Sequence, residues 1–68
     1  MKITVNGEPR TVAEATPLIT LIPLPEGDEK RRGIAIARNG EVVRRAEWDG
    51  VILGEGDAIE ILKAAQGG

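Results

Sequence analysis

The sequence predicts an α+β domain in which one short helix packs across a mixed sheet. Three observations lead to this prediction. Stretches of alternating apolar and polar residues indicate strands, two Asn-Gly pairs mark hairpin turns, and a single segment has the helical spacing of apolar residues. Because a single helix cannot bury two faces of a sheet, it is expected to pack across one of them.

The first predicted hairpin lies at the start of the chain. Residues 1–5 alternate between apolar and polar side chains, which predicts a strand with one buried face. Asn6-Gly7 follows, and this pair is the strongest short hairpin signal because both residues tolerate a positive φ. The returning strand is predicted over Pro9 to Val12, with the proline at the strand end, where it is acceptable.

The predicted helix follows this hairpin. Thr16 has the character of an N-cap and Pro17 that of the first helical residue. Three apolar residues at positions i, i+3 and i+4 form one helical face: Leu18, Leu21 and Ile22. Prolines at positions 23 and 25 end the helix after about two turns. The charged stretch over residues 25–33 then predicts a solvated loop.

A second hairpin is predicted in the middle of the chain. Gly33 to Arg38 contains small and β-branched residues, which favours a buried central strand. Asn39-Gly40 marks the turn, and Glu41 to Val43 forms the returning strand.

The last part of the chain contains an irregular segment and a final strand. Arg44 to Asp49 predicts an irregular stretch or a short helical turn, with Trp48 in the core. Gly54 to Asp57 predicts a turn, in which Glu55 and Asp57 are solvated charges without the spacing of a calcium loop. Residues 57–64 alternate again and predict the last strand. Strand alternation places Ile59 and Ile61 on one face and Leu62 on the other.

The order of these elements predicts a ubiquitin-like β-grasp fold. A hairpin, a helix, a second hairpin, an irregular segment and a final strand follow one another. The helical crossover permits the first and last strands to lie side by side in parallel. We expect residues 1–65 to form this domain and residues 66–68 to form a flexible C-terminal tail.

Composition excludes several classes of function. The 68 residues include no Cys, His or Ser, so neither a Ser-His or Cys-His nucleophile pair nor a thiolate zinc site can be built. We expect the chain itself to bind no metal and no cofactor. The net charge of -2 lacks the excess of basic residues that is typical of nucleic-acid-binding proteins. The single aromatic residue, Trp48, offers no platform for stacking bases.

No membrane segment or signal peptide is predicted. The most apolar stretch, Ala15 to Leu24, is too short to span a bilayer and contains Pro17 and Pro23. Acidic residues precede it and no cleavage-like site follows. The absence of cysteine fits a cytoplasmic protein.

The tail is the feature with the most chemical meaning. Gln66-Gly67-Gly68 closely follows the last predicted strand, and two glycines without Cβ atoms make a narrow segment able to thread into a catalytic channel of another protein. The terminal carboxyl is ionised at neutral pH and is therefore a poor acyl donor. It would need activation, for example as a mixed anhydride with a nucleotide, and a thiocarboxylate made from it would be a sulfur nucleophile.

Most of the chain resembles the thiamine-biosynthesis sulfur carriers of the ThiS type. The resemblance is carried by Ile36 to Val43, Arg45 to Trp48, Gly56 to Ile61 and Ala65 to Gly68, and the N-terminal segment Met1 to Arg10 is similar as well. The matching stretches have the order and spacing of that family.

The resemblance implies a cycle in which partner enzymes do the chemistry. An E1-like adenylating enzyme would use ATP to activate Gly68, with Gln66 and Gly67 threading into that partner. A sulfur donor system supplied by a cysteine desulfurase would form the thiocarboxylate (1-thioglycine) on Gly68. Thiazole synthase would then take the sulfur into the thiazole ring. Leu62, if exposed, is a candidate docking contact for the partner.

Three alternatives stay open at this point. Molybdopterin sulfur carriers share the fold and the Gly-Gly end. A ubiquitin-like protein modifier would instead form isopeptide bonds with lysines. A β-grasp interaction module would not use its tail as a carrier at all.

Overall fold

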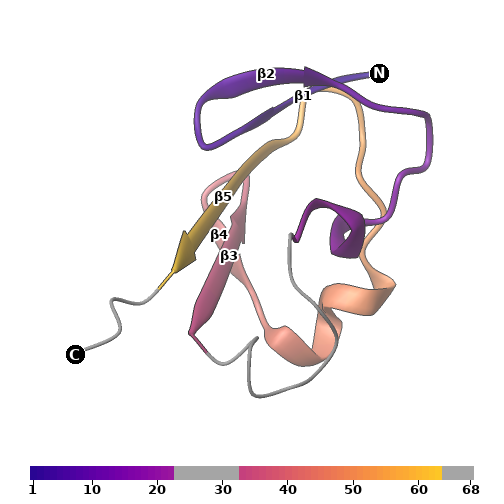
Figure 1. Cartoon of the computed structure of the whole chain (residues 1–68). Coiled ribbons are helices and arrows are strands. Elements are labelled where there is room, and N and C mark those ends of the chain that lie inside the picture. Colours follow the sequence, from indigo (N-terminus) through magenta and orange to yellow (C-terminus); the bar gives the residue numbers. More distant parts are fainter. Residues whose placement is uncertain (23–32, 64–68) are drawn as a thin grey trace.

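The computed structural model describes residues 1–22 and 33–63 of the chain. Its centre is a five-stranded sheet with the order β2-β1-β5-β3-β4 (Figure 1). The strands are β1 Lys2–Val5, β2 Glu8–Thr11, β3 Ile34–Arg38, β4 Glu41–Val43 and β5 Ala58–Lys63. Two short 3₁₀ helices, η1 Leu18–Leu21 and η2 Arg45–Gly50, are the other elements found in these described residues. The predicted loop over residues 25–33 lies almost entirely outside the described residues.

Both Asn-Gly hairpins form as the sequence predicts. The φ angles are 52° at Asn6 and 83° at Gly7, and 53° at Asn39 and 85° at Gly40, so each turn has two residues in the left-handed region. This geometry suits the twist of the flanking strands. The strand that returns from the first turn begins at Glu8, one residue earlier than predicted, because Val5 pairs with Glu8 directly across the turn.

The last strand lies in the middle of the sheet and joins the two hairpins. β5 runs parallel to β1, with Thr4 opposite Ala58 and Val5 opposite Ile59. On its other side it runs antiparallel to β3, from Ile34 opposite Lys63 to Arg38 opposite Ile59. The predicted parallel pairing of the first and last strands is thereby confirmed, and the mixed sheet has the β-grasp arrangement.

The predicted two-turn α-helix is wrong: the segment is a single 3₁₀ turn. Pro17 is extended (φ -70°, ψ 143°) and bridges to Ile52, so it lies outside the helix. Thr16 caps nothing; its hydroxyl donates to the Ala13 carbonyl at 2.6 Å. Ile22 is also extended, as expected for a residue that precedes a proline. The four residues between these two extended positions are too few for an α-helix, and i→i+3 bonds close the turn instead.

The core lies between the sheet and the two 3₁₀ helices. Its buried side chains come from all of these layers: Ile3, Val5, Leu18, Ile22, Ile36, Trp48, Leu53 and Ile59. Trp48 is 1% exposed and donates its indole N–H to the Val43 carbonyl at 2.9 Å. The predicted core position of Trp48 is confirmed, and the polar edge of its ring is satisfied as burial requires.

The prediction that Asp57 is a solvated charge is wrong. Its side chain is buried and accepts hydrogen bonds from the Gly54 N–H at 2.8 Å, Arg38 Nε at 2.9 Å and Asn39 Nδ2 at 3.1 Å. Asn39 Oδ1 in turn accepts from the Ala58 N–H at 2.9 Å. The second hairpin turn is therefore fastened to the turn that precedes β5. Glu55 is exposed, as predicted.

Candidate functional site at the end of the last strand

The candidate site begins where β5 ends. β5 is the central strand of the sheet and ends at Lys63, away from β1 and β2 (Figure 1), and the sequence continues from there into the tail. Gln66, Gly67 and Gly68, the predicted carrier and threading residues, lie outside the described residues, so their roles and their flexibility stay predictions. The structure does fix the position of Lys63, because β3 pairs with β5 as far as Ile34 opposite Lys63, while β1 pairs with β5 only at Ala58 and Ile59.

Leu62 lies on the face of the sheet opposite the core. Its side chain is 64% exposed, whereas Ile59, three residues earlier on the other face, is 1% exposed. This exposure was the condition for treating Leu62 as a docking contact, and it is met. The apolar side chain lies next to the last described residue of the strand that leads into the tail.

Leu62 is part of a small apolar area that spans three strands. Ala35 of β3 lies directly opposite Leu62, and Ala37 of β3 lies directly opposite Val42 of β4. Residues opposite each other across a ladder point to the same face, so these four side chains form one surface, which we call the outer patch. The exposed Glu60 of β5, also opposite Ala37, lies on the same face. Val42 is 76% exposed, and Ala35 is exposed although the sequence predicted β3 to be buried.

A buried electrostatic network holds the start of the same strand. Burial of the Asp57 carboxyl acts to raise its pKa, but the hydrogen bonds from the Gly54 N–H, Asn39 and Arg38 and the charge of Arg38 outweigh it. The pKa of Asp57 therefore lies below its ordinary value. The carboxylate stays ionised at neutral pH and fixes β5 against β3. The start of β5 is thus held by this network, and the outer patch lies at its other end.

Comparison with known proteins identifies the family. The sequence model of the ThiS family matches residues 3–68, which is nearly the whole chain and includes the Gly-Gly end. The chain belongs to the ThiS family. This confirms the resemblance noted in the sequence, and with it the ubiquitin-like β-grasp fold.

Two solved structures support the assignment of this ThiS-family chain. The crystal structure of the thiamine biosynthesis protein ThiS from Geobacter metallireducens is 33% identical, with all of both chains covered and a TM-score of 0.74. The solution structure of a thiamine biosynthesis protein from the same organism is 35% identical, covers 100% of this chain and 88% of that one, and has a TM-score of 0.73. A comparison with the curated proteins gave no match.

Two kinds of feature are absent from the described part of this ThiS-family chain, a metal-binding cluster and a membrane-spanning helix. Within residues 1–22 and 33–63, no group of three His, Cys, Asp or Glu side chains is placed to hold a metal ion. Over the same residues, no helix has the length and apolar character needed to cross a membrane. What the described residues present is the outer patch, beside the end of β5 at Lys63.

Sequence reasoning found one of the four outer-patch residues. Leu62 was identified because strand alternation alone separates it from Ile59 and Ile61. Val42, Ala35 and Ala37 were missed because their neighbourhood depends on the β3–β4 and β3–β5 registers. The available signal was the predicted hairpin at Asn39-Gly40, which would have placed Ala37 opposite Val42.

Proposed function

We propose that this ThiS-family chain is a sulfur carrier of thiamine biosynthesis that works through the carboxylate of Gly68. The observation that carries the proposal is the family match over residues 3–68, which reaches the Gly-Gly end. It is supported by the full coverage of a thiamine biosynthesis protein of similar fold. The chain is then a protein cosubstrate, and residues 1–65 act as the domain that presents residues 66–68.

The proposed chemistry has two steps on the carboxyl carbon of Gly68. A carboxylate oxygen attacks the α-phosphorus of ATP in an E1-like adenylating enzyme, forming an acyl-adenylate and releasing pyrophosphate. A sulfur donor system then delivers sulfide sulfur to the acyl carbon and AMP leaves, which gives the thiocarboxylate. Activation is required because the ionised carboxylate is itself a poor acyl donor. Thiazole synthase is the proposed acceptor of that sulfur.

The outer patch is the proposed docking surface for the adenylating enzyme. A tail threaded into an enzyme needs a neighbouring surface to hold the domain in place, and Leu62 lies one residue from the end of β5. Leu62 and Val42 are among the large apolar side chains that stay exposed in the described part of the chain. Covering them in a complex removes apolar area from water, which favours association. We also propose that the protein and these partner enzymes work in the cytoplasm.

The decisive experiment follows the mass of the C-terminal peptide. The chain is incubated with the cognate adenylating enzyme, ATP and a sulfur donor, and the expected product has one terminal oxygen of Gly68 replaced by sulfur. A variant with one residue added after Gly68 should fold normally and accept no sulfur, since the adenylation site then meets another carboxyl. Gly67→Val should react more slowly because its branched Cβ restricts the tail.

The same experiment separates the alternatives. Sulfur transfer to the C-terminally extended variant would refute the carrier proposal. Recovery of Gly68 joined to lysine side chains would favour a protein modifier, and full function after deletion of Gly67 and Gly68 would favour an interaction module. Transfer of sulfur to a molybdopterin precursor in place of the thiazole precursor would assign the carrier to the other pathway.

A further inference from the structure

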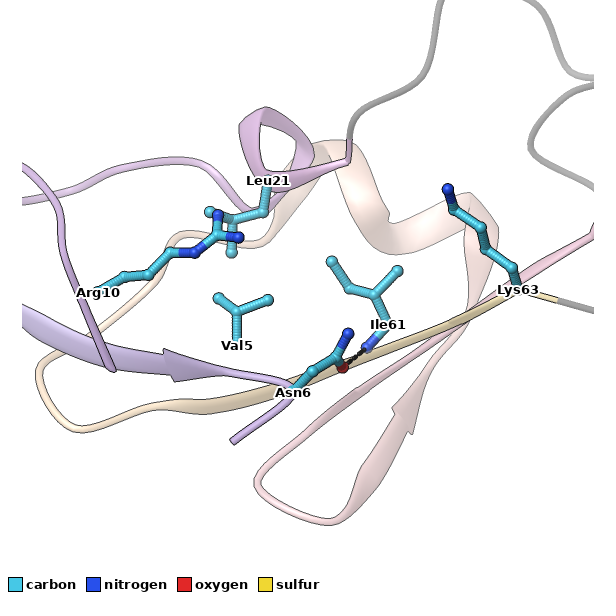
Figure 2. A pocket seen from close by; sticks show the side chains of 6 residues that line it. All are labelled: Val5, Asn6, Arg10, Leu21, Ile61 and Lys63. Carbon is cyan, nitrogen blue, oxygen red and sulfur yellow. Dashed lines mark hydrogen bonds between the residues drawn. The ribbon is translucent and has the colours of Figure 1, made fainter. Parts of the chain in front are cut away.

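A cleft opens on the inner face of the sheet, away from the outer patch. Its volume is about 270 Å³, near the lower end of the range for small-molecule sites (Figure 2). Strands β1, β2 and β5, the turn between β1 and β2 and the helix η1 contribute the six side chains that line it: Val5, Asn6, Arg10, Leu21, Ile61 and Lys63. None of these residues belongs to the outer patch, so the cleft is a separate feature of the molecule.

The helix on this face of the sheet is short. η1 ends at Leu21, and Ile22 is already extended. Ile61, in the C-terminal half of β5, is only partly buried. Val5 and Ile61 therefore form an apolar floor and Leu21 forms an apolar wall (Figure 2).

The polar groups of the cleft are hydrogen-bond donors. Asn6 Oδ1 already accepts from the Ile61 N–H at 2.8 Å, and this bond turns the Asn6 Nδ2 donor into the cleft (Figure 2). The side chains of Arg10 and Lys63 rise from the sheet on opposite sides of the floor (Figure 2). Guanidinium and ammonium groups carry donors and no acceptor.

No acidic side chain among the lining residues balances these two cations. Glu8 shares the face of Val5 across the β1–β2 ladder but does not line the cleft. Within residues 1–22 and 33–63 the only ion pair joins Arg38 and Asp57, so no described carboxylate neutralises Arg10 or Lys63. A ligand with hydrogen-bond acceptors and negative charge would therefore complement these donors.

We propose that this cleft binds a small amphipathic anion, with an apolar body on the floor and a carboxylate or phosphate at its rim, in the field of Arg10 and Lys63. The body covers Val5, Leu21 and Ile61. The anionic head accepts a hydrogen bond from Asn6 Nδ2 or from one of the two cations, while the other cation attracts it through its charge. Neither the tail nor the outer patch takes part, so the proposal stands apart from sulfur transfer. Its failure would leave the carrier function untouched.

The test is an NMR titration of the ¹⁵N-labelled full chain with octanoate. Saturable shifts are expected at the Asn6 side-chain amide and at the backbone amides of Leu21, Ile61 and Lys63. Octanol, which lacks the charge, and acetate, which lacks the apolar body, should each bind at least about five-fold more weakly. Octyl phosphate in a parallel titration shows which anionic head binds more tightly. Equal binding of octanol, or shifts centred on Leu62 and Val42, would overturn the proposal.

Charge reversal provides the second test. Arg10→Glu and Lys63→Glu should each weaken octanoate binding at least about five-fold, because an attraction becomes a repulsion at a partly exposed site. Arg45→Glu is the matched control: it makes the same change of net charge at an exposed position of η2 and should leave the affinity unchanged. An equal loss of octanoate affinity in all three variants would show that only the net charge of the protein matters, and would refute the site. The wild-type comparison of octanoate with octanol decides the question even if one variant fails to fold.

Discussion

Removing the Asp57 carboxylate tests how strongly the buried network holds the fold. Asp57→Ala leaves the Gly54 N–H, Arg38 Nε and Asn39 Nδ2 without their acceptor. At about 1 kcal/mol for each bond, and with the Arg38 side chain 36% exposed and able to regain water, we expect a loss of about 2–4 kcal/mol. A domain of 68 residues has a total stability of about 3–10 kcal/mol, so this loss is a large fraction of the whole.

Urea unfolding measures this loss directly. Trp48 is the only tryptophan and is buried, so its fluorescence reports the transition without a label. With a slope of about 1 kcal/mol/M for a domain this small, Asp57→Ala should lower the urea midpoint by about 2–4 M. Asp49→Ala removes an exposed carboxylate from η2 and should change the stability by less than about 0.5 kcal/mol.

The pH dependence identifies the charge as the cause. The pKa of Asp57 is lowered in the folded state, so its contribution is complete above the ordinary carboxyl pKa of about 3.9 and is lost as the pH falls through the folded pKa. Asp57→Asn keeps an acceptor for the Gly54 N–H but has no charge to lose. The wild-type protein should therefore exceed Asp57→Asn in stability at pH 6, and the difference should shrink below pH 4. A difference that stays constant down to pH 2, or an Asp57→Ala midpoint equal to that of wild type, would refute the reasoning.

Three further predictions concern the patch, the core and the first turn. Leu62→Glu should raise the KM for adenylation about ten-fold and leave the urea midpoint unchanged. Thr11→Glu, at an exposed position of β2, should leave this KM unchanged. An equal KM for Leu62→Glu and wild type would remove Leu62 from the interface. Leu18→Ala should cost about 2–5 kcal/mol in urea unfolding, because Leu18 is 0% exposed, and a loss below about 1 kcal/mol would contradict its place in the core. Asn6→Gly tolerates the positive φ and loses only the hydrogen bond from the Ile61 N–H, so it should cost about 1 kcal/mol. Asn6→Ala loses this bond and also disfavours the positive φ, so it should cost about 2 kcal/mol. The reverse order would argue against this account of the turn.

The strands and turns could be predicted because their signals are local. Alternation over a few residues fixed which face Ile59 and Leu62 occupy, and the left-handed preference of Asn-Gly placed both hairpins. The helix was overestimated because helical spacing of Leu18, Leu21 and Ile22 was given more weight than the prolines on either side. Those prolines leave room for only four helical residues.

The features missed from sequence depend on contacts between distant segments. Asp57 looks like a turn residue, and only the fold brings it to Arg38 and Asn39, which lie 19 and 18 positions away. Val42 joins the outer patch only through the ladder that sets it opposite Ala37. The inner cleft is likewise formed by β1, β2, η1 and β5 together, and no single stretch of the sequence predicts it.

The central place of β5 has a mechanical consequence. A partner that draws on the segment after Lys63 applies force along the strand, while the bonds to β1 and β3 run across it. Bonds in this geometry are loaded in shear and share the load, whereas an edge hairpin would be peeled open one bond at a time. Tension applied to the chain beyond Lys63 would therefore be shared along β5 and transmitted to its neighbouring strands, without breaking their hydrogen bonds one at a time.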